Sequence, residues 1–414
     1  MQATAAAAAA PVWRRIPKVE AILSIFLFVA AILLPVAKQF IFGEPPTQSQ
    51  EGRPLAPTPI FQLTADALDI FPAKFADYYG DHFGLRAKLL SLGNFLKVKY
   101  LQASPSQYAV VGKSGWLYSS GDGAEPRFNG TAIFKQLQLE SWRLAIERKQ
   151  KWCEQRGIKY LLVAAPDKET IYPEFVPSRF GLSHTPSPLD QLMRYLSASG
   201  NDLPVLDLRV ALFDAKKREQ VYYRGDSHWN HLGAFVGYTQ IMDQLAQWFP
   251  DLKPEPRSHF QIVTSPRRGD DLERMIGIPD YTSDTEYMFA PAPGAQSKKT
   301  VVDIPGVVPL TEVQHPFLME TPPSSSGQPT LKAVVVRDSF TIALIPFLSE
   351  HFSRALYLWR PLVVDAQFEK GVAGAIEAEH PDIVIEEIVE RKILQLVPND
   401  AVEQLAFGAE SDAH

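Results

Sequence analysis

The 414-residue sequence contains a single cysteine, Cys153, so it can form no intramolecular disulfide, no CxxC pair and no cysteine-based zinc cage. It also lacks blocks of basic residues: 41 Lys and Arg stand against 47 Asp and Glu, which gives a net charge of -6. Surfaces that bind nucleic acid are strongly basic, so we expect no nucleic-acid partner. With 46% hydrophobic and 21% charged residues, the chain has enough apolar side chains to build a folded core.

A long uncharged run lies near the amino terminus. Residues 21–37, AILSIFLFVAAILLPVA, carry no charge. At a rise of about 1.5 Å per residue, this run and its flanks match a hydrocarbon layer of about 30 Å. We therefore predict a transmembrane anchor over residues 19–40. Three basic residues precede it, which predicts a cytoplasmic tail over residues 1–18 and, in a bacterium, a single-pass inner-membrane protein with its remainder in the periplasm.

A cleaved signal peptide is the alternative to an anchor. Its cleavage site would be poor, because Pro35 and Lys38 flank the small residues near the end of the run. Residues 41–59 are rich in proline and polar side chains, so we expect an extended periplasmic linker there. The folded domain is then predicted to cover residues 60–414.

The pattern of the domain alternates between strand-like and helix-like segments. A helical pattern over residues 134–157 precedes a buried strand, and another helix is expected over residues 230–249. The expected strands are residues 158–166, 203–209, 220–229, 331–336, 355–359 and 381–389. This alternation predicts the α/β class, with a doubly wound, mostly parallel sheet covered by helices on both faces.

Three other regions accompany this pattern. Aromatic residues at helical spacing between residues 71 and 95 predict one or two amphipathic helices whose aromatic face packs in the core. Residues 108–118 read YAVVGKSGWLY, which predicts a β-hairpin around GKSG. The Pro-rich region about 250–330 is a poor candidate for the central sheet, so we expect a loop-rich insertion or a small β excursion.

Ser339 occupies the position where a ligand is expected in this class of fold. It follows the strand 331–336 and opens a helix-like segment, and open α/β sheets bind ligands at the carboxyl ends of their strands. A backbone N–H there, aided by the start of a helix, can hold a developing oxyanion, as a nucleophilic serine requires. A serine that merely caps the helix is the simpler interpretation of RDS alone. A nucleophile also needs a base and a group that orients the base.

The segment YYRGDSHWNHLG contains both groups. Asp226 and His228 lie two residues apart, so in an extended turn the carboxylate can hold Nδ1–H of the imidazole and leave Nε2 free to take a proton from Ser339. One alternative is a metal trio that adds His231, but no further His or Cys cluster completes such a site, and we expect no metal. A purely structural His228 is the other alternative.

These elements together resemble the SGNH hydrolase-like domain of the alginate O-acetylation proteins of the AlgX/AlgJ type. A D-x-H-W element at 226–229 precedes a V-x-D-S-F element at 336–340. Further landmarks in matching order are VVGKSGWLY (110–118), LLVAAPDKETIYPEFVP (161–177), GDDLERMIG (269–277) and PDIVIEEIVER (381–391). The resemblance covers most of the chain after residue 60.

The resemblance implies a catalytic triad of Ser339, His228 and Asp226, in an order permuted relative to ordinary SGNH esterases. It also implies acetyl transfer from a donor to Ser339 and then to a hydroxyl of an exported polysaccharide, without a cofactor. Because acetyl-CoA stays in the cytoplasm, we expect a membrane-bound O-acyltransferase to supply the acetyl group. The same triad also suits a carbohydrate O-acetyl esterase, and a non-catalytic scaffold protein of polysaccharide secretion is the third alternative.

The sequence departs from the family pattern at Arg337, where a glycine is frequent. Arg337 is expected either to pair with Asp338 or Glu386 or to hold an anionic sugar or acetyl oxygen. No carbohydrate-binding module follows the last landmark, so the anchored AlgJ-like plan fits better than the AlgX plan.

Three more residues are candidates for substrate binding. Trp229 can stack on a sugar ring or pack in the core. Lys168 and Tyr172 follow a predicted strand and can line the cleft or stabilise a loop.

Overall fold

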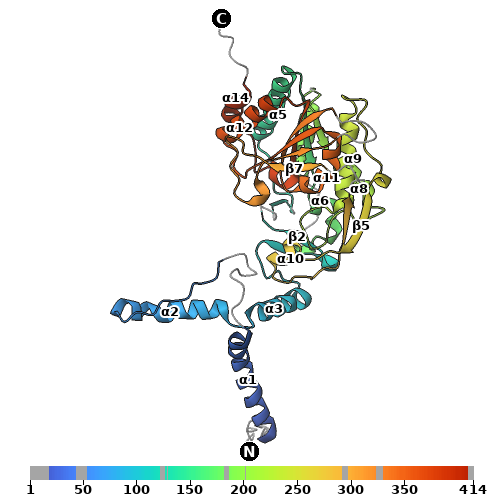
Figure 1. Cartoon of the computed structure of the whole chain (residues 1–414). Coiled ribbons are helices and arrows are strands. Elements are labelled where there is room, and N and C mark those ends of the chain that lie inside the picture. The colour runs from blue at the N-terminus through green and yellow to red at the C-terminus, as the bar shows by residue number, and fades with distance from the viewer. Residues whose placement is uncertain are drawn as a thin grey trace, which may run out of the picture. The chain divides into compact units, whose positions relative to one another are not determined.

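The computed structural model describes residues 18–42, 54–121, 126–127, 129–180, 186–200, 202–290, 297–322 and 330–408. The chain divides into two compact units, Met1–Phe95 and Leu96–His414 (Figure 1). Residues 60–95 of the predicted domain therefore belong to the first unit. Most of the predicted cytoplasmic tail and residues 43–53 of the predicted linker lie outside the described residues.

The first unit contains helices α1 (Lys18–Phe42) and α2 (Ala65–His82), and α3 (Arg86–Leu101) begins in it. Among the described residues, no helix combines the length and apolar character needed to cross a membrane. The transmembrane helix predicted over residues 19–40 is therefore not supported.

The aromatic residues of α2 do not form a core, contrary to the prediction. α2 has no buried side chain, although its start is capped by Thr64, whose Oγ1 accepts the Ala67 N–H at 3.4 Å. The rings contact one another along the helix instead, with centroids 6.0 Å apart for Phe71 and Phe75 and 6.3 Å apart for Phe75 and Tyr79.

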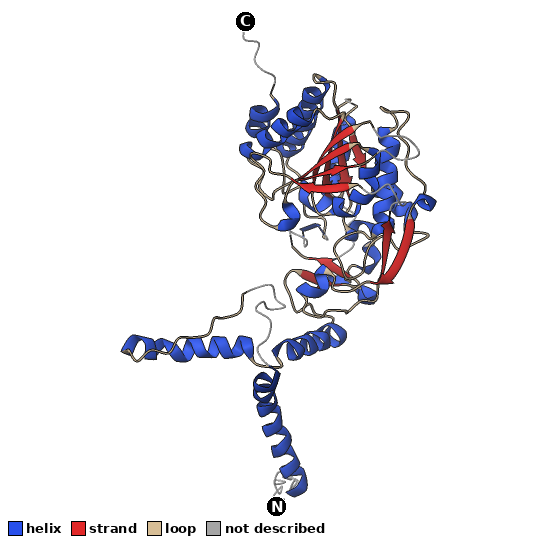
Figure 2. Ribbon diagram, in the orientation of Figure 1, coloured by secondary structure: helices blue, strands red, loops and turns tan. Residues whose placement is uncertain are grey.

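The second unit is built on a seven-stranded sheet with the order β4-β3-β11-β9-β10-β8-β7 (Figure 2). Its strands are β3 (Lys159–Ala165), β4 (Val205–Asp207), β7 (Lys298–Val301), β8 (Phe317–Glu320), β9 (Lys332–Arg337), β10 (Arg354–Trp359) and β11 (Ile383–Val389). Strands β4, β3, β11, β9 and β10 are parallel, whereas β8 and β7 are antiparallel to their neighbours. The sheet is mixed and mostly parallel, as the alternating pattern predicted.

Helices cover both faces of this sheet because its strands are apolar on both sides. Along β9, Val335 faces one core cluster and Val334 and Val336 face the other. The first cluster is covered by α8 (Arg209–Ala215), α9 (His231–Leu245) and α11 (Ile345–Leu348), and the second by α5 (Gln136–Glu154), α7 (Pro188–Ala198), α12 (Ala366–Glu379) and α14 (Asp400–Phe407). Short helices α6 (Lys168–Ile171), α10 (Asp271–Met275) and α13 (Glu390–Ile393) complete the unit.

The smaller β elements agree only in part with the predictions. The hairpin is confirmed, because β1 (Ala109–Val111) pairs antiparallel with β2 (Leu117–Ser119). The insertion contains the expected β excursion, in which β5 (Gln261–Pro266) pairs with β6 (Thr285–Ala290). Its exclusion from the central sheet was wrong, since β7 and β8 extend that sheet. In β8, Phe317 and Leu318 reach the two core clusters in turn, so this short strand adds apolar surface to both.

The strand predicted over residues 220–229 is absent from this described segment. Only a single bridge joins Tyr222 to Trp229, and the Tyr223 N–H donates to the His228 carbonyl at 3.4 Å. The segment therefore turns back on itself at residues 224–227 instead of joining the sheet.

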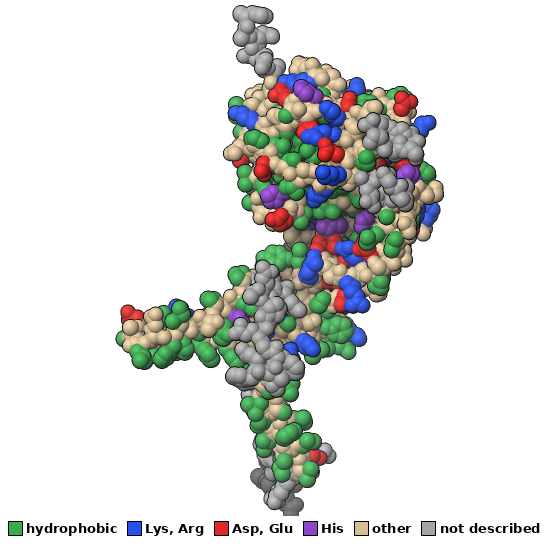
Figure 3. Space-filling model, viewed as in Figure 1, with side chains coloured by type: hydrophobic (Ala, Val, Ile, Leu, Met, Phe, Trp, Pro, Cys, Tyr) green, Lys and Arg blue, Asp and Glu red, His purple; other side chains and the backbone are tan. Residues whose placement is uncertain are grey.

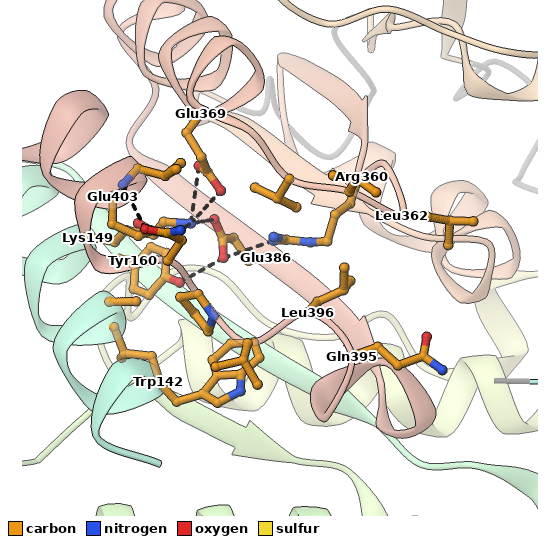
Figure 4. A pocket seen from close by; sticks show the side chains of 18 residues that line it. Trp142, Lys149, Tyr160, Arg360, Leu362, Glu369, Glu386, Gln395, Leu396 and Glu403 are labelled. Carbon is orange, nitrogen blue, oxygen red and sulfur yellow. Dashed lines mark hydrogen bonds and ion pairs between the residues drawn. The ribbon is translucent and has the colours of Figure 1, made fainter. Parts of the chain in front are cut away.

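A buried ionic cluster lies between the sheet and α5, α12 and α14 (Figure 4). Lys149 Nζ of α5 lies 2.9 Å from Glu386 Oε1 of β11, 3.4 Å from Glu369 Oε2 and 3.5 Å from Glu403 Oε1. Arg360 Nη2 lies 3.0 Å from the other carboxylate oxygen of Glu386. The cluster thus joins three helices to one strand through a single ammonium group.

Replacement of Lys149 by methionine should lower the free energy of unfolding by about 3–5 kcal/mol, because three buried carboxylates would lose their shared cation. Urea unfolding of the full chain would measure this loss. Lys151→Met is the matched control, since Lys151 lies on the same helix but is exposed. Equal losses in the two variants would show that the cluster contributes nothing specific.

Candidate active site

Ser339 lies directly beyond the carboxyl end of β9, in a loop that Asp338 holds in place. The Asp338 carboxylate accepts the Phe340 N–H on Oδ1 at 2.8 Å and the Val389 N–H on Oδ2 at 2.9 Å. Since Val389 ends β11, the serine loop is tied to the neighbouring strand. Asp338 therefore positions the loop and does not point at the serine hydroxyl.

The helix expected after Ser339 is shorter than predicted. A 3₁₀ turn, Phe340–Ala343, leads into the four-residue α11, and a second 3₁₀ turn, Ser349–His351, follows. Pro346 lies in the first turn of α11, where it cannot donate a backbone hydrogen bond to a preceding turn. The Phe340 N–H is occupied by Asp338, whereas the described residues offer no acceptor to the Ser339 N–H. The Ser339 N–H is thus the backbone donor of this turn that an oxyanion could use.

The three residues predicted as a triad lie within hydrogen-bond distance in series. Ser339 Oγ lies 2.7 Å from His228 Nε2, and His228 Nδ1 lies 2.7 Å from Asp226 Oδ1. The same Asp226 oxygen accepts the His228 backbone N–H at 3.1 Å, which fixes the imidazole relative to the carboxylate. The structure therefore places an imidazole beside the serine hydroxyl and a carboxylate beside the imidazole, the arrangement that a nucleophilic serine requires.

Asp226 is buried but stays ionised. Burial raises the pKa of its carboxyl group, but the hydrogen bond and charge of His228, together with the charge of Arg267, hold that pKa well below its usual range. Arg267 Nη2 donates to Asp226 Oδ2 at 3.0 Å. An ionised carboxylate can accept the Nδ1–H of His228 and stabilise the imidazolium that forms when the base takes a proton.

Lys168 lies next to this site but does not line a cleft. It is only 2% exposed, and its Nζ donates to the backbone carbonyls of Tyr223, Arg224 and Asp226 at 3.0, 3.1 and 2.6 Å. Burial lowers its pKa to about 8. Of the two roles weighed for Lys168, the contacts are those of a residue that stabilises the loop carrying Asp226.

Lys168→Met is expected to lower the free energy of unfolding by about 3 kcal/mol, because three buried carbonyls would lose their donor. Thermal unfolding of the full chain and steady-state kinetics with 4-nitrophenyl acetate would be compared with those of Lys217→Met, because the Lys217 side chain is exposed and pairs with the exposed Asp214. A raised KM at unchanged stability would instead show that Lys168 takes part in substrate binding.

The other three substrate-binding candidates are buried as well. Trp229 is 1% exposed, and its Nε1–H donates to the Phe340 carbonyl at 3.0 Å, which braces the serine loop. The Tyr172 hydroxyl accepts the Val221 N–H at 3.0 Å. Their burial favours the alternatives in which Trp229 packs in the core and Tyr172 stabilises a loop.

Among the described contacts, Arg337 forms no ion pair with the carboxylate of Asp338 or Glu386, although its Nη1 donates to the backbone carbonyl of Asp338 at 3.4 Å. Its Nη2 donates to the Val313 carbonyl at 2.9 Å, and its guanidinium lies 4.8 Å from the ring centroid of Trp359. The side chain is 1% exposed, and burial lowers its pKa to about 10. Glu386 belongs to the Lys149 cluster instead. Arg337 is therefore a buried core residue at the carboxyl end of β9.

Two polar residues of the site were given no role from sequence. Arg267 contacts Asp226, and Asp271 accepts the Ser227 N–H at 2.8 Å and the Ser227 hydroxyl at 2.5 Å. Asp271 Oδ2 also lies 3.7 Å from His228 Nδ1. Asp271 lies in the landmark GDDLERMIG, and Arg267 lies just before it. This position in the chain was the one signal from which the sequence could have assigned them to the site.

The site also offers a possible set of metal ligands. Among the described residues, donor atoms of Asp226, His228 and Asp271 lie within 4.8 Å of one another. Both nitrogens of His228 already have protein partners, however, and His231 Nδ1 lies 3.0 Å from Glu286 Oε1. The trio weighed from the sequence, which included His231, does not form.

On the face seen in Figure 3, histidine, acidic and basic side chains gather where β2, α10 and β5 lie in Figure 1.

Comparison with known proteins bears on both fold and activity. Residues 109–301 match the family described as SGNH hydrolase-like domain, acetyltransferase AlgX. A protein called probable alginate O-acetylase AlgJ from Pseudomonas aeruginosa is 26% identical over 294 residues, which cover 67% of this chain and 71% of the relative. Its namesake from Pseudomonas syringae pv. tomato is 29% identical over 196 residues, or 47% of each chain.

Among solved structures, Bacillus cereus PatB1 is similar with a TM-score of 0.50 and 17% identity, over 69% of this chain and 98% of that chain. This likeness concerns the fold alone. The family match includes Asp226 and His228 and ends before Ser339. Together, the family match and the two relatives confirm the resemblance inferred from the motifs.

Proposed function

Since the chain carries an SGNH hydrolase-like domain of the acetyltransferase AlgX type, we propose that it transfers acetyl groups through Ser339 to hydroxyls of an exported polysaccharide. The observation that carries the proposal is the series of two 2.7 Å contacts from Ser339 to His228 and from His228 to Asp226. A scaffold protein would have no need of this arrangement.

The proposed reaction has two steps with His228 as the proton carrier. In the first, His228 Nε2 takes the hydroxyl proton while Ser339 Oγ attacks the acetyl carbonyl carbon of the donor, and the leaving group departs with that proton. In the second, Nε2 takes the proton of a sugar hydroxyl, whose oxygen attacks the acetyl carbon. The bond from that carbon to Oγ breaks, and Ser339 regains a proton. Asp226 stabilises the imidazolium in both steps.

The proposed acceptor follows from the relatives, and the proposed donor follows from the proposed location of the domain. Because two relatives are called probable alginate O-acetylase AlgJ, we take an alginate-type polysaccharide as the acceptor to test first. A domain outside the cytoplasm has no access to acetyl-CoA, so a membrane-bound O-acyltransferase is the proposed source of acetyl groups.

The proposed location is the periplasm, with a single-pass anchor in the inner membrane. Support comes from the uncharged run at residues 21–37 and the three basic residues before it. Protease added to spheroplasts should cut the chain, and alkaline carbonate should leave it in the membrane pellet. Protection from protease would overturn the location, and release by carbonate would overturn the anchor.

The decisive experiment follows the acetyl group. The full chain would be incubated with 4-nitrophenyl acetate, with and without alginate oligosaccharide, and mapped by mass spectrometry. An adduct on Ser339 that moves to the sugar supports the transferase, and one released only to water indicates an esterase. Peptide mapping also separates Ser339 from Ser227, whose hydroxyl lies 3.3 Å from His228 Nδ1. Absence of an adduct on Ser339 would overturn the proposal.

A further inference from the structure

Arg267 is the most highly connected cation near the candidate site. It follows β5 in the insertion, and each of its three guanidinium nitrogens contacts a different carboxylate. Nη2 donates to Asp226 Oδ2 at 3.0 Å, Nε donates to Asp270 Oδ1 at 2.6 Å, and Nη1 donates to Glu286 Oε2. The guanidinium also lies 4.4 Å from the ring centroid of Tyr223.

These contacts hold the guanidinium in one orientation. The Tyr223 hydroxyl donates to the other oxygen of Glu286 at 2.6 Å, and the Arg267 N–H donates to the Asp284 carbonyl at 2.9 Å. A planar fork with partners on three sides has little freedom to rotate. Arg267 thus meets Asp226 as a fixed group.

The surroundings of Asp226 explain why a cation is needed there. Asp270 and Asp271 lie close by, and burial, together with the charge of Asp226, raises the pKa of both carboxyl groups. The other charged groups facing Asp226 are His228, bonded to Oδ1, and Lys168, which binds its backbone carbonyl. Only Arg267 contacts Oδ2 with a formal positive charge among the described residues.

We propose that Arg267 is a positioning residue, which fixes the Asp226 carboxylate from the side opposite His228 so that Oδ1 accepts the imidazole Nδ1–H. The inference rests on the proposed function, because it concerns how the base of that reaction is oriented. It also gives the insertion a role in the chemistry, since Arg267 reaches the site from the end of β5. A lysine here would keep the charge but lose the fork that joins Asp226 to Asp270 and Glu286.

The test compares Arg267→Gln and Arg267→Lys in the full chain with the matched control Arg268→Gln. The Arg268 side chain is 75% exposed, and its Nη1 lies 3.7 Å from Asp280 Oδ2. Arg267→Gln should lower kcat for 4-nitrophenyl acetate about 10–100-fold at little changed KM, the range seen when a group that orients a functional side chain is lost. The acidic limb of its pH profile should move to higher pH, because Asp226 loses a nearby positive charge and binds a proton more readily. Arg267→Lys should recover part of kcat and most of the profile.

A second measurement separates this inference from the proposed function. The Nδ1–H proton of His228 would be observed by NMR, with its signal assigned through His228→Gln. Because this proton is bonded to Asp226 Oδ1, its chemical shift should change in Arg267→Gln and stay in place in Arg268→Gln. Turnover that does not depend on Ser339 would overturn the proposed function, and the Nδ1–H signal would then decide the role of Arg267. An unchanged Nδ1–H signal together with an unshifted pH profile would overturn that role.

Discussion

Replacement of Ser339 by alanine is expected to lower turnover of 4-nitrophenyl acetate about 10⁴–10⁶-fold, the range measured when a serine nucleophile is removed from a triad. The hydroxyl lies 2.7 Å from His228 Nε2, and no other described atom meets this nitrogen as a nucleophile. The fold should persist, because the hydroxyl caps no helix. The measurement is a stopped assay of released 4-nitrophenol, with circular dichroism to compare the folded fractions.

Ser265→Ala provides the control for this change, because Ser265 lies exposed on β5 and takes no part in the site. Its turnover should equal that of the wild type. If Ser339→Ala retained a tenth of the wild-type rate, a different nucleophile would have to carry the acetyl group.

Asp226→Asn is expected to lower kcat about 10⁴-fold, the effect of the same change in a serine protease triad. An amide keeps the size of the carboxylate but can donate to His228 Nδ1, which favours the wrong tautomer, and it cannot stabilise the imidazolium. Loss of the charge also weakens the contact with Arg267. Steady-state kinetics with 4-nitrophenyl acetate would measure the change.

The second carboxylate beside the same imidazole supplies the comparison. Asp271 Oδ2 lies 3.7 Å from His228 Nδ1, beyond hydrogen-bond distance, and it binds the Ser227 hydroxyl instead. Asp271→Asn should therefore lower kcat far less than Asp226→Asn. Equal losses would mean that the two acids share the orienting role.

The sequence predicted the site because its signals are local. Asp226 and His228 are two residues apart, and Ser339 follows a clear apolar run, so the spacing and the strand rule place them at one sheet edge. The same local reasoning failed for residues 220–229. Their apolar and aromatic residues suit a strand, but the carbonyls of Tyr223 and Arg224 bind Lys168, which lies more than fifty residues earlier. A distant partner of this kind leaves no mark in the segment itself.

Burial of charged residues was the other feature that the sequence did not reveal. Lining the cleft was one of two roles weighed for Lys168, and holding a substrate oxygen was one of two weighed for Arg337, whereas Lys and Arg are seldom fully buried. Both are buried here, and backbone carbonyls accept hydrogen bonds from their side chains. Arg267 was missed for a different reason. It lies in a Pro-rich insertion without helix or strand periodicity, and only the fold brings it to Asp226.

The ionic cluster around Lys149 makes folding a proton-linked equilibrium. Burial, with the charges of Glu369 and Glu386, raises the pKa of Glu403 to about 7, whereas an exposed glutamate titrates near pH 4.3 in an unfolded chain. Between these two values the folded protein holds a proton that the unfolded chain has released. The stability contributed by Glu403 is therefore fully present below about pH 4.3 and is lost as the pH rises through about 7. Near neutral pH, folding takes up protons through this residue, which lies on the face of the sheet opposite Trp229.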